Sequence, residues 1–572
     1  MAARASNPPL VSRRALAAGV LAAASAVALP GCVPAEGDAG SGSAAVGTAT
    51  ADEPLRIAVR TPSCIDPYNC QTDSDRQIVW QLFDPLTVYD FEQGEPVGRA
   101  AASWDVSDDA CTFTFHLVEG ATFHNGDPVD ARSFKRAWNR VASPESAVAS
   151  RYGASSLGYL LALVEGYEAV ASGAARSLSG VSCPDDLTLV VALVQPYADF
   201  ACVVAHPALA PVPRLASYSP SAFYLAPAGN GPFMLAEGSA WEAGEDVELV
   251  RFEGYCGEPA AVDALRFVMT DDADDAYRSL QAGDLDVADV PIDEISSARK
   301  GYGASSDGCT MSDEERLVIG AEPAVGYLAC NLAREPFSDA DVRRAASMAI
   351  DRDALCKNVY KRTRFAAGGI VPAGVAGYRA SAWACCEHDV EQAEALLQGR
   401  YPAEETEAGE LERSVPFELV YYEDGGHGEL VEFLADDLAE VGLVAEAVPL
   451  GWEALQERLA AGEFDLALLS WTMDFPAMDN VLYPLFHSDS LGGRNVSGYG
   501  SAEVDAAIDE ARALVEADAR VERLQEAEDL AAADVPVIPL LFYGHALAGS
   551  ERIGYLYCDP QGRIDAASVE LV

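Results

Sequence analysis

One aspartate in this chain stands where an α/β sheet would bind a ligand. Asp474 lies in the stretch 471–476, between the aromatic residues Trp471 and Phe475 and directly after the apolar run 466–469. A carboxylate in apolar surroundings favours a cationic partner, because an ion away from water needs an opposite charge and hydrogen bonds. The chemistry predicted here is therefore binding of a cationic group. The alternative interpretation is an exposed loop aspartate beside two core aromatic residues.

Alternating strand and helix patterns precede Asp474. From residue 417 onward, apolar residues recur with helical spacing or form short strand-like runs. These patterns predict strand 417–422, helix 428–441, strand 443–448, helix 452–461 and strand 465–470. Units of this kind form parallel sheets, whose ligands bind in the crevice beyond the carboxyl ends of the strands. The sequence therefore places Asp474 at such a crevice.

Strand and helix patterns also occur in the rest of the chain. They predict strands at 55–59, 112–117 and 187–193, a short helix at 134–141, a long helical stretch from Ser501 to Pro536, and strand-like sequence from 553 to 572. No internal repeat is present, so the expected architecture is mixed α/β. Glycine and proline gather at 227–232, which predicts a chain crossing between lobes.

Composition limits the partners of the protein. The chain of 572 residues is longer than one hydrophobic core serves, so two or more lobes are expected. Its formal net charge of -52 argues against nucleic acid or anionic lipid as a partner of the folded part. A salt-tolerant surface or a compositional bias of the whole proteome is the favoured explanation of this acidity, and attraction of cationic ligands is the alternative.

Residues 1–32 are typical of an export signal. Arg13 and Arg14 precede the apolar stretch 15–29, which is too short to span a bilayer. The stretch ends in Leu-Pro-Gly-Cys, which resembles a lipobox and predicts acylation of Cys32. Residues 33–51, rich in Gly, Ala and Ser, would form a flexible tether. The arginine pair also resembles a twin-arginine motif, so export by that route and by the general route both stay open.

Twelve cysteines follow Cys32, and an exported protein can form disulfides. Cys64 and Cys70 flank the short loop 66–69, and this spacing predicts a disulfide between them. No C-x-x-C pair is present, so neither a zinc ribbon nor a redox motif is indicated.

Several motifs together resemble the family 5 extracellular solute-binding proteins of bacterial ABC importers, and the oligopeptide-binding type in particular. The motifs are 82–86 (LFDPL), 101–109 (AASWDVSDD), 112–117 (TFTFHL), 120–129 (GATFHNGDPV), 229–233 (GNGPF), 281–286 (QAGDLD), 336–339 (PFSD), 342–345 (VRRA) and 349–352 (AIDR). The resemblance extends over nearly all of 52–572. It departs at Val118 and Glu119, where the family usually has basic residues.

This resemblance implies an α/β fold of the periplasmic-binding-protein type: a two-lobed clamp with an extra inserted domain. Lobe I would comprise 52–90, 228–326 and 545–572. The inserted domain II would comprise 91–227, and lobe III would comprise 327–544. The strand and helix series before Asp474 then falls in lobe III.

The resemblance also implies a ligand and the residues that bind it. Asp474, in a W-x-x-D pattern with Trp471 and followed by Phe475, matches the aspartate that receives the α-ammonium of a peptide. Tyr68 and Asn69 would line the opposite wall, although a plain surface turn is an equal alternative for their loop. The expected function is that of a lipid-anchored monomeric subunit outside the cell. It would capture short peptides and deliver them to a permease driven by ATPase subunits.

Other functions stay open. Family members of this type also carry nickel chelates, haem or sugars, so a non-peptide ligand on the same fold is the first alternative. No cofactor or metal is expected, because the seven histidines lie far apart and His124 reads as structural. An exported hydrolase is a more remote alternative, since the chain lacks G-x-S-x-G, H-E-x-x-H and P-loop motifs. A sensor that binds peptide without a transporter is a third.

Overall fold

The computed structural model describes residues 53–405 and 411–572. The predicted export signal 1–32 with Cys32 and the whole of the tether 33–51 lie outside the described residues, as does residue 52. Within the described residues, no helix has the length and apolar character needed to cross a membrane.

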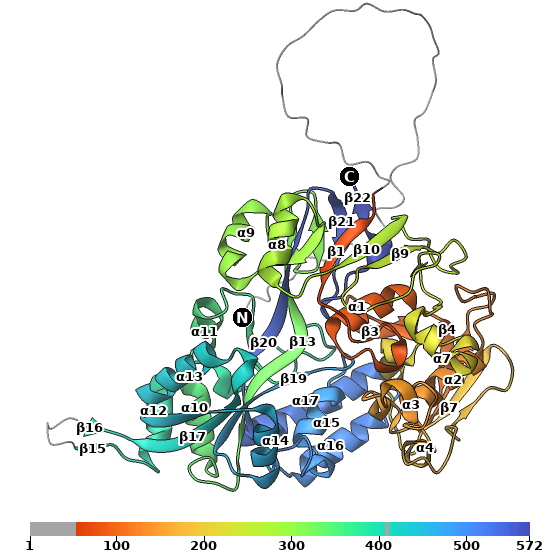
Figure 1. The fold of residues 1–572 in the computed structure, drawn as a ribbon. Coiled ribbons are helices and arrows are strands. Elements are labelled where there is room, and N and C mark those ends of the chain that lie inside the picture. Colours follow the sequence, from red (N-terminus) through yellow and green to blue (C-terminus); the bar gives the residue numbers. More distant parts are fainter. Residues whose placement is uncertain (1–52, 406–410) are drawn as a thin grey trace, which may run out of the picture. The chain divides into compact units, whose positions relative to one another are not determined.

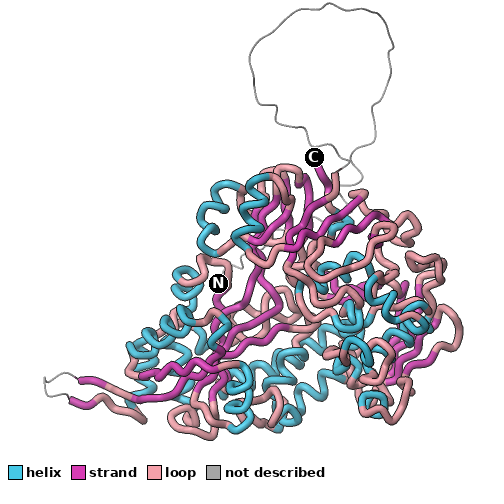
Figure 2. The backbone as a smooth tube through the Cα atoms, viewed as in Figure 1, coloured by secondary structure: helices cyan, strands magenta, loops and turns pink. Residues whose placement is uncertain are grey.

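The largest element is an 11-stranded sheet with the order β18-β17-β19-β13-β20-β11-β1-β10-β9-β8, in which β14 also pairs with β20 (Figures 1 and 2). Its strands are β1 Leu55–Val59, β8 Phe233–Leu235, β9 Val247–Arg251, β10 Ala264–Met269, β11 Val287–Asp289, β13 Leu317–Cys330, β14 Phe365–Ala366, β17 Val415–Tyr422, β18 Leu443–Leu450, β19 Leu466–Thr472 and β20 Val537–Gly549. We refer to β8–β11 and β1 as the β1 side of the sheet, and to β17–β19 as the β17 side.

Two long antiparallel strands, β13 and β20, join the two sides. On the β17 side, β13 pairs with β19 through residues 324–330. On the β1 side, β20 pairs with β11 through residues 547–549. The register between β13 and β20 shifts between Ala321 and Val325, so the ladder is interrupted where the two sides meet. The lobe boundaries expected at 326/327 and 544/545 fall inside these two strands.

The series of strands and helices before Asp474 is confirmed. Helices α13 (Gly428–Glu440) and α14 (Trp452–Ala461) connect β17, β18 and β19. Strand β17 pairs in parallel with both β18 and β19. Helix α13 buries Leu430, Leu434 and Leu438, which lie one turn apart on one face. The amphipathic spacing was therefore sufficient to locate these elements to within two residues.

A separate four-stranded sheet with the order β4-β5-β7-β6 forms in the segment 91–227. Its strands are β4 Ala101–Val106, β5 Thr112–Leu117, β6 Val181–Ser182 and β7 Thr188–Ala192. As predicted, Phe113, Phe115 and Leu117 are the buried face of β5. The helices of this segment are α2 Ala131–Ala142, α3 Ala149–Tyr152, α4 Tyr167–Ala171, α5 Phe200–Val203, α6 Leu215–Tyr218 and α7 Pro220–Leu225.

Shorter strands and further helices complete the described fold. The strands are β2 Thr87–Asp90, β3 Glu95–Gly98, β12 Thr310–Ser312, β15 Glu404–Glu405, β16 Leu411–Glu412, β21 Ile553–Tyr557 and β22 Glu570–Leu571. The helices are α1 Asp73–Leu82, α8 Ala273–Ala282, α9 Ile295–Gly301, α10 Ala340–Ala349, α11 Arg352–Asn358, α12 Val390–Gln398, α15 Asp479–Phe486, α16 Ala502–Arg512 and α17 Ala517–Asp534.

The long helical stretch expected from Ser501 to Pro536 is wrong as a single element, because it forms the two helices α16 and α17. The chain leaves the helical path after Arg512. Arg520 then donates to the carbonyls of Leu514 (2.8 Å) and Val515 (3.1 Å), which satisfies backbone groups that a continuous helix would have bonded itself.

The predicted crossing at 227–232 is a close contact between two chain segments. A Cβ atom on Gly229 would lie 1.8 Å from the carbonyl oxygen of Leu82, at the end of α1. Between the glycines, Asn230 accepts from the backbone N–H of Asp84 (3.1 Å) and donates to its carbonyl (3.0 Å). The glycines are therefore required by the approach of the backbones, and the asparagine fixes their register.

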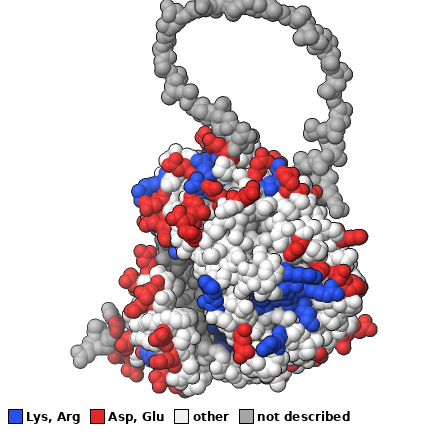
Figure 3. All heavy atoms as spheres, turned by 45° about the vertical axis from the view of Figure 1, so that its right-hand side comes forward, with Lys and Arg blue, Asp and Glu red and all other residues white. Residues whose placement is uncertain are grey.

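Acidic side chains are spread over the surface. Figure 3 shows Asp and Glu scattered over one face of the molecule and Lys and Arg gathered in smaller areas. Because carboxylates are so common in this chain, an acidic residue is informative only where its surroundings differ from those of the open surface.

We predict that Gly229→Ala destabilises the protein by about 2 kcal/mol or more, because the new methyl group collides with backbone that has no room to move. Urea unfolding followed by circular dichroism measures this change. Gly428→Ala is the matched control, since a Cβ atom there meets nothing within 4 Å. An equal effect of the two substitutions would contradict the role assigned to Gly229.

Candidate functional site

A cavity of about 720 Å³ lies where the two sides of the large sheet meet. Its walls include residues 57–60 at the end of β1, 287–289 at the end of β11 and 472–476 after β19. Strand β1 runs parallel to β11, whereas the pairings through β20 and β13 orient β19 in the opposite direction. The carboxyl ends of strands from both sides therefore point into one cavity, as expected for a ligand site in an α/β sheet.

Asp474 lines this cavity and contacts the 91–227 segment. Its Oδ1 accepts a hydrogen bond of 2.7 Å from the hydroxyl group of Tyr159. Its backbone N–H donates to Oδ1 of Asn480 at 3.2 Å. Burial raises the pKa of Asp474, and the hydrogen bond from Tyr159 and the attraction of Arg76 and Arg494 oppose this effect. The negative charge of Asp474 is thus only partly balanced by these neighbours, as expected of a group that binds a cation.

Helix α15, which follows Asp474, is fixed at both ends. At its start, Asp479 forms a two-point ion pair with Arg512 of α16 (2.8 and 3.0 Å). The backbone carbonyl of Arg512 in turn accepts a hydrogen bond of 2.8 Å from the backbone N–H of Ala198 in the 91–227 segment. Because Asn480 belongs to this helix and bonds to Asp474, these contacts position the carboxylate.

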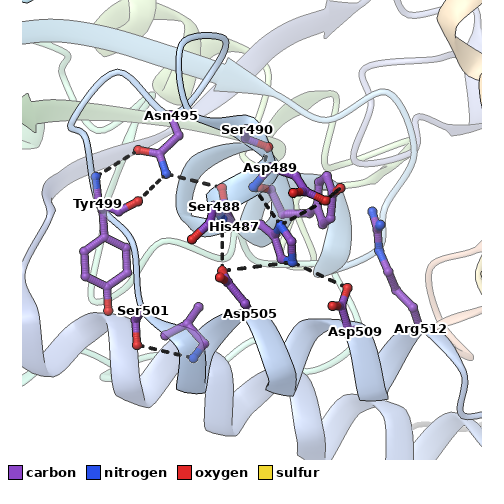
Figure 4. A network of polar contacts seen from close by, with 12 residues as sticks. His487, Ser488, Asp489, Ser490, Asn495, Tyr499, Ser501, Asp505, Asp509 and Arg512 are labelled. Carbon is purple, nitrogen blue, oxygen red and sulfur yellow. Dashed lines mark hydrogen bonds and ion pairs between the residues drawn. The ribbon is translucent and has the colours of Figure 1, made fainter.

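The other end of α15 rests on α16 through a polar network (Figure 4). His487 stacks on Tyr483 with 4.4 Å between ring centroids. Its Nε2 lies 3.4 Å from a carboxylate oxygen of Asp509 and 4.0 Å from one of Asp505, both on α16. Nearby, Asn495 donates to the carbonyl of Tyr499 at 2.8 Å, which holds the connection to α16.

The two aromatic residues predicted beside Asp474 have different positions. Phe475 is buried and lines the cavity. Trp471 is not among the lining residues. Its indole N–H has no hydrogen-bond partner among the described residues, and the guanidinium of Arg494 lies 6.0 Å from its ring centroid. Trp471 therefore belongs to the surroundings of Asp474 rather than to the cavity wall.

The structure places neither Tyr68 nor Asn69 among the residues that line the cavity. Tyr68 is buried, and its hydroxyl donates to the carbonyl of Gly153 at 3.4 Å. Asn69 accepts a hydrogen bond of 2.9 Å from the backbone N–H of Ser156. Both side chains contact the 91–227 segment, so their observed role is to join two parts of the fold.

The predicted disulfide between Cys64 and Cys70 is wrong in this structure, where both thiols are free and buried. The thiol of Cys64 donates to the carbonyl of Asp66 at 3.3 Å. The loop is held instead by the carboxylate of Asp66, which accepts from the backbone of Tyr68 and forms a buried ion pair of 2.6 Å with Arg140. An ion pair across 74 positions of sequence replaces the expected covalent link.

Sequence reasoning missed several charged residues that line the cavity. They are Arg60, Asp73, Arg76, Asp289, Glu322, His545 and Arg563. Asp289 is the last residue of β11 and Arg60 directly follows β1, so the rule that ligands bind at carboxyl ends of strands could have indicated both.

A sheet whose two sides direct strand ends into one shared cavity is the architecture of a ligand-binding clamp. Residues 95–493 match the family described as bacterial extracellular solute-binding proteins, family 5. The chain belongs to this family.

Known proteins of similar sequence and fold agree with this assignment. The chain is 27% identical to a dipeptide-binding protein, DppE, of Bacillus subtilis, over 82% of this chain and 83% of that protein. It is 26% identical to a probable deoxycholate-binding periplasmic protein, YgiS, of Escherichia coli, over 84% and 86% of the two chains. The solved structure of HbpA2 from Haemophilus parasuis matches with a TM-score of 0.78 at 21% identity, covering 91% of this chain and 99% of that one.

We predict that Asp474→Asn stabilises the ligand-free protein at neutral pH. The pKa of Asp474 in the folded state is raised above its unfolded value, about 3.9. The carboxyl group therefore contributes stability below the unfolded pKa, and this contribution is lost as the pH rises through the folded pKa. Asparagine retains an acceptor for Tyr159 without the charge. Urea unfolding should give the variant a higher free energy of unfolding than the wild type at pH 7. This difference should shrink as the pH approaches about 4.

Asp108→Asn is the control, because Asp108 is an exposed aspartate outside the cavity. It should change stability little at either pH. A variant Asp474→Asn that is less stable than the wild type at pH 7 would show that the ionised carboxylate is already compensated.

Proposed function

We propose that this protein is the solute-binding subunit of an ABC importer, anchored to the outer face of the cytoplasmic membrane, and that it captures short peptides through their free α-ammonium group. The observation that carries the proposal is the partly buried carboxylate of Asp474, which lines the cavity and has the hydroxyl of Tyr159 as its hydrogen-bond donor. A peptide ammonium would supply the positive charge that this carboxylate lacks.

The charges of the cavity suit a ligand with both signs. Its lining includes the acidic residues Asp73, Asp289, Glu322 and Asp474 and the basic residues Arg60, Arg76 and Arg563. A short peptide is a zwitterion at neutral pH, with an ammonium at one end and a carboxylate at the other. Its backbone could also pair with the free amides and carbonyls of strand ends in the wall.

The names of relatives support a peptide without excluding other ligands. The B. subtilis relative is named for dipeptide binding, whereas the E. coli relative is named for probable deoxycholate binding. Deoxycholate carries a carboxylate and no ammonium, so a dependence on the ammonium separates these two ligand classes.

Closure of the two sides around the ligand is part of the proposal. The sides are joined by β13 and β20, whose register shifts at the cavity wall between Ala321 and Val325. Bending at this shift would exclude water from the cavity, and the ion pair with Asp474 would become stronger in the drier surroundings. The closed form would then be presented to the permease.

We predict that short peptides with free amino ends stabilise the protein and that the same peptides with acetylated amino ends do not. At about 100 times its dissociation constant, a ligand adds about 2.7 kcal/mol to stability. Asp474→Ala should weaken binding by about a hundredfold, because the ammonium would be buried without its partner. Thermal unfolding of the ligand-stripped protein, with titration calorimetry of the peptides that respond, measures both effects.

The control Asp108→Asn should bind like the wild type. Equal stabilisation by free and acetylated peptides would contradict the role of Asp474 while leaving peptide binding intact. If neither the free nor the acetylated peptides stabilise the protein, peptide binding is contradicted and a non-peptide ligand on the same fold is favoured.

The lipid anchor rests on the sequence around Cys32, which lies outside the described residues. We predict that Cys32→Ser moves the protein from the detergent phase to the aqueous phase in Triton X-114 partition of whole cells, because the acylated side chain is lost. Cys256→Ser, at an exposed cysteine, is the control and should stay with the detergent. Retention of Cys32→Ser in the detergent phase would contradict acylation at this residue.

A further inference from the structure

A second acidic group lies in the cavity, on the strands that connect the two sides. Asp289 ends β11, and Glu322 lies at the register shift of β13. Both line the cavity. Within residues 53–405 and 411–572, the carboxylate of Asp289 has no hydrogen bond or ion pair, and that of Glu322 has one long ion pair, to Nδ1 of His545 at 3.6 Å. These two carboxylates are therefore available to a ligand.

His545 is a buried side chain of the same cavity whose hydrogen bonding is incomplete. Its side chain is only 8% exposed and lines the same cavity. Its Nε2 lies 3.6 Å from the thiol of Cys558. Its Nδ1 has no hydrogen-bond partner among the described residues, although it faces Glu322. A buried imidazole nitrogen with only this long contact and no hydrogen bond is unfavourable, and from its place in the cavity wall it can contact a bound molecule.

Charged groups of both signs surround Asp289. Part of its side chain is exposed, but its position in the cavity wall removes hydration and raises its pKa, and the carboxylates of Glu322 and Asp73 act in the same direction. His545 and Arg60 act in the opposite direction, but neither forms an ion pair with Asp289. Asp73 is paired with Arg76, whereas among the described residues Asp289 has no ion pair and Glu322 has only the long one to His545. A cationic group would therefore relieve the repulsion between Asp289 and Glu322.

This group is separate from Asp474 but close to it. Strands β13 and β19 pair from Cys330 and Leu466 to Ala324 and Thr472. The backbone N–H of Met473 also donates to the carbonyl of Pro323 at 2.9 Å. Glu322 directly precedes Pro323 in the chain, and Asp474 directly follows Met473. The two acidic residues therefore lie on the same side of this last contact. One short ligand can therefore reach both carboxylates with two cationic groups.

We propose that Asp289 and Glu322, with His545, form a subsite for a second cationic group of the ligand, so that the protein prefers peptides with an arginine or lysine side chain. This assignment rests on the proposed peptide function and adds a selection that Asp474 cannot make, since every peptide has an α-ammonium. An organic cation fits better than a metal, because no group of three or more His, Cys, Asp or Glu among the described residues is arranged to hold a metal ion.

The test compares arginine with citrulline, which has nearly the same shape and no charge. Titration calorimetry would use tri-alanine, the three tripeptides with one arginine among alanines, and their citrulline counterparts. We expect the wild type to bind the best arginine peptide about tenfold or more tightly than its citrulline counterpart. In the double variant Asp289→Asn with Glu322→Gln, this ratio should fall to about twofold or less while tri-alanine binds as before.

The matched control is Asp284→Asn with Glu314→Gln, which removes two exposed carboxylates from the same part of the chain. It should keep the full preference for arginine. Unchanged binding of tri-alanine by the subsite variant shows that it is folded, and Asp289→Asn alone is measured if the double variant does not fold.

The outcomes separate this assignment from the function on which it rests. A wild type that binds tri-alanine but treats arginine and citrulline alike overturns the subsite and leaves peptide capture standing. A preference for arginine over citrulline that persists in the subsite variant also overturns the subsite. Equal weakening of the binding of all the peptides overturns it as well. If no peptide binds, not even tri-alanine, the proposed function fails and the subsite fails with it.

Discussion

Hydrogen bonding between β13 and β20 is the constraint on which the rest of the structure depends. These two strands pair with each other on both sides of the large sheet, so the sides cannot separate without breaking the longest ladder in the described fold. The ladder shifts register between Ala321 and Val325 and again between Gly326 and Tyr327, and the cavity lies at the first of these shifts. A site placed there lies beside the longest strand pairing in the described fold. The closure proposed above would bend the strands at this shift and leave the pairing within each side unchanged.

The binding carboxylate illustrates how function and stability oppose each other. Asp474 is buried enough to disfavour its own charge, and the surrounding structure compensates only in part through Tyr159. Full compensation by a protein cation would leave nothing for a ligand to supply. The fold maintains this unfavourable arrangement because α15 is fixed at both ends, by Asp479 with Arg512 and by His487 against α16. The fixed position of α15 therefore holds the carboxylate of Asp474 in place although its charge is unfavourable there.

Sequence reasoning succeeded where the signal was local and failed where it was not. The strands and helices from β17 to β19 follow from the spacing of apolar residues, and this order alone delivers Asp474 and Phe475 to the cavity. Tyr159 lies 315 positions from Asp474, and only the folded chain brings them together. Asp289, Glu322 and His545 come from three different strands for the same reason. The spacing of Cys64 and Cys70 suggested a covalent loop, because nothing local reveals that Arg140 pairs with Asp66.

The free thiols have a consequence for how the 64–70 loop is held. Every cysteine in the described part of the chain is reduced, including the pair in the loop that Asp66 and Arg140 hold. Ion pairs form equally well in reducing and oxidising surroundings, whereas disulfides need an oxidant. The contacts that hold the 64–70 loop in the described fold are therefore independent of the redox state of the surroundings.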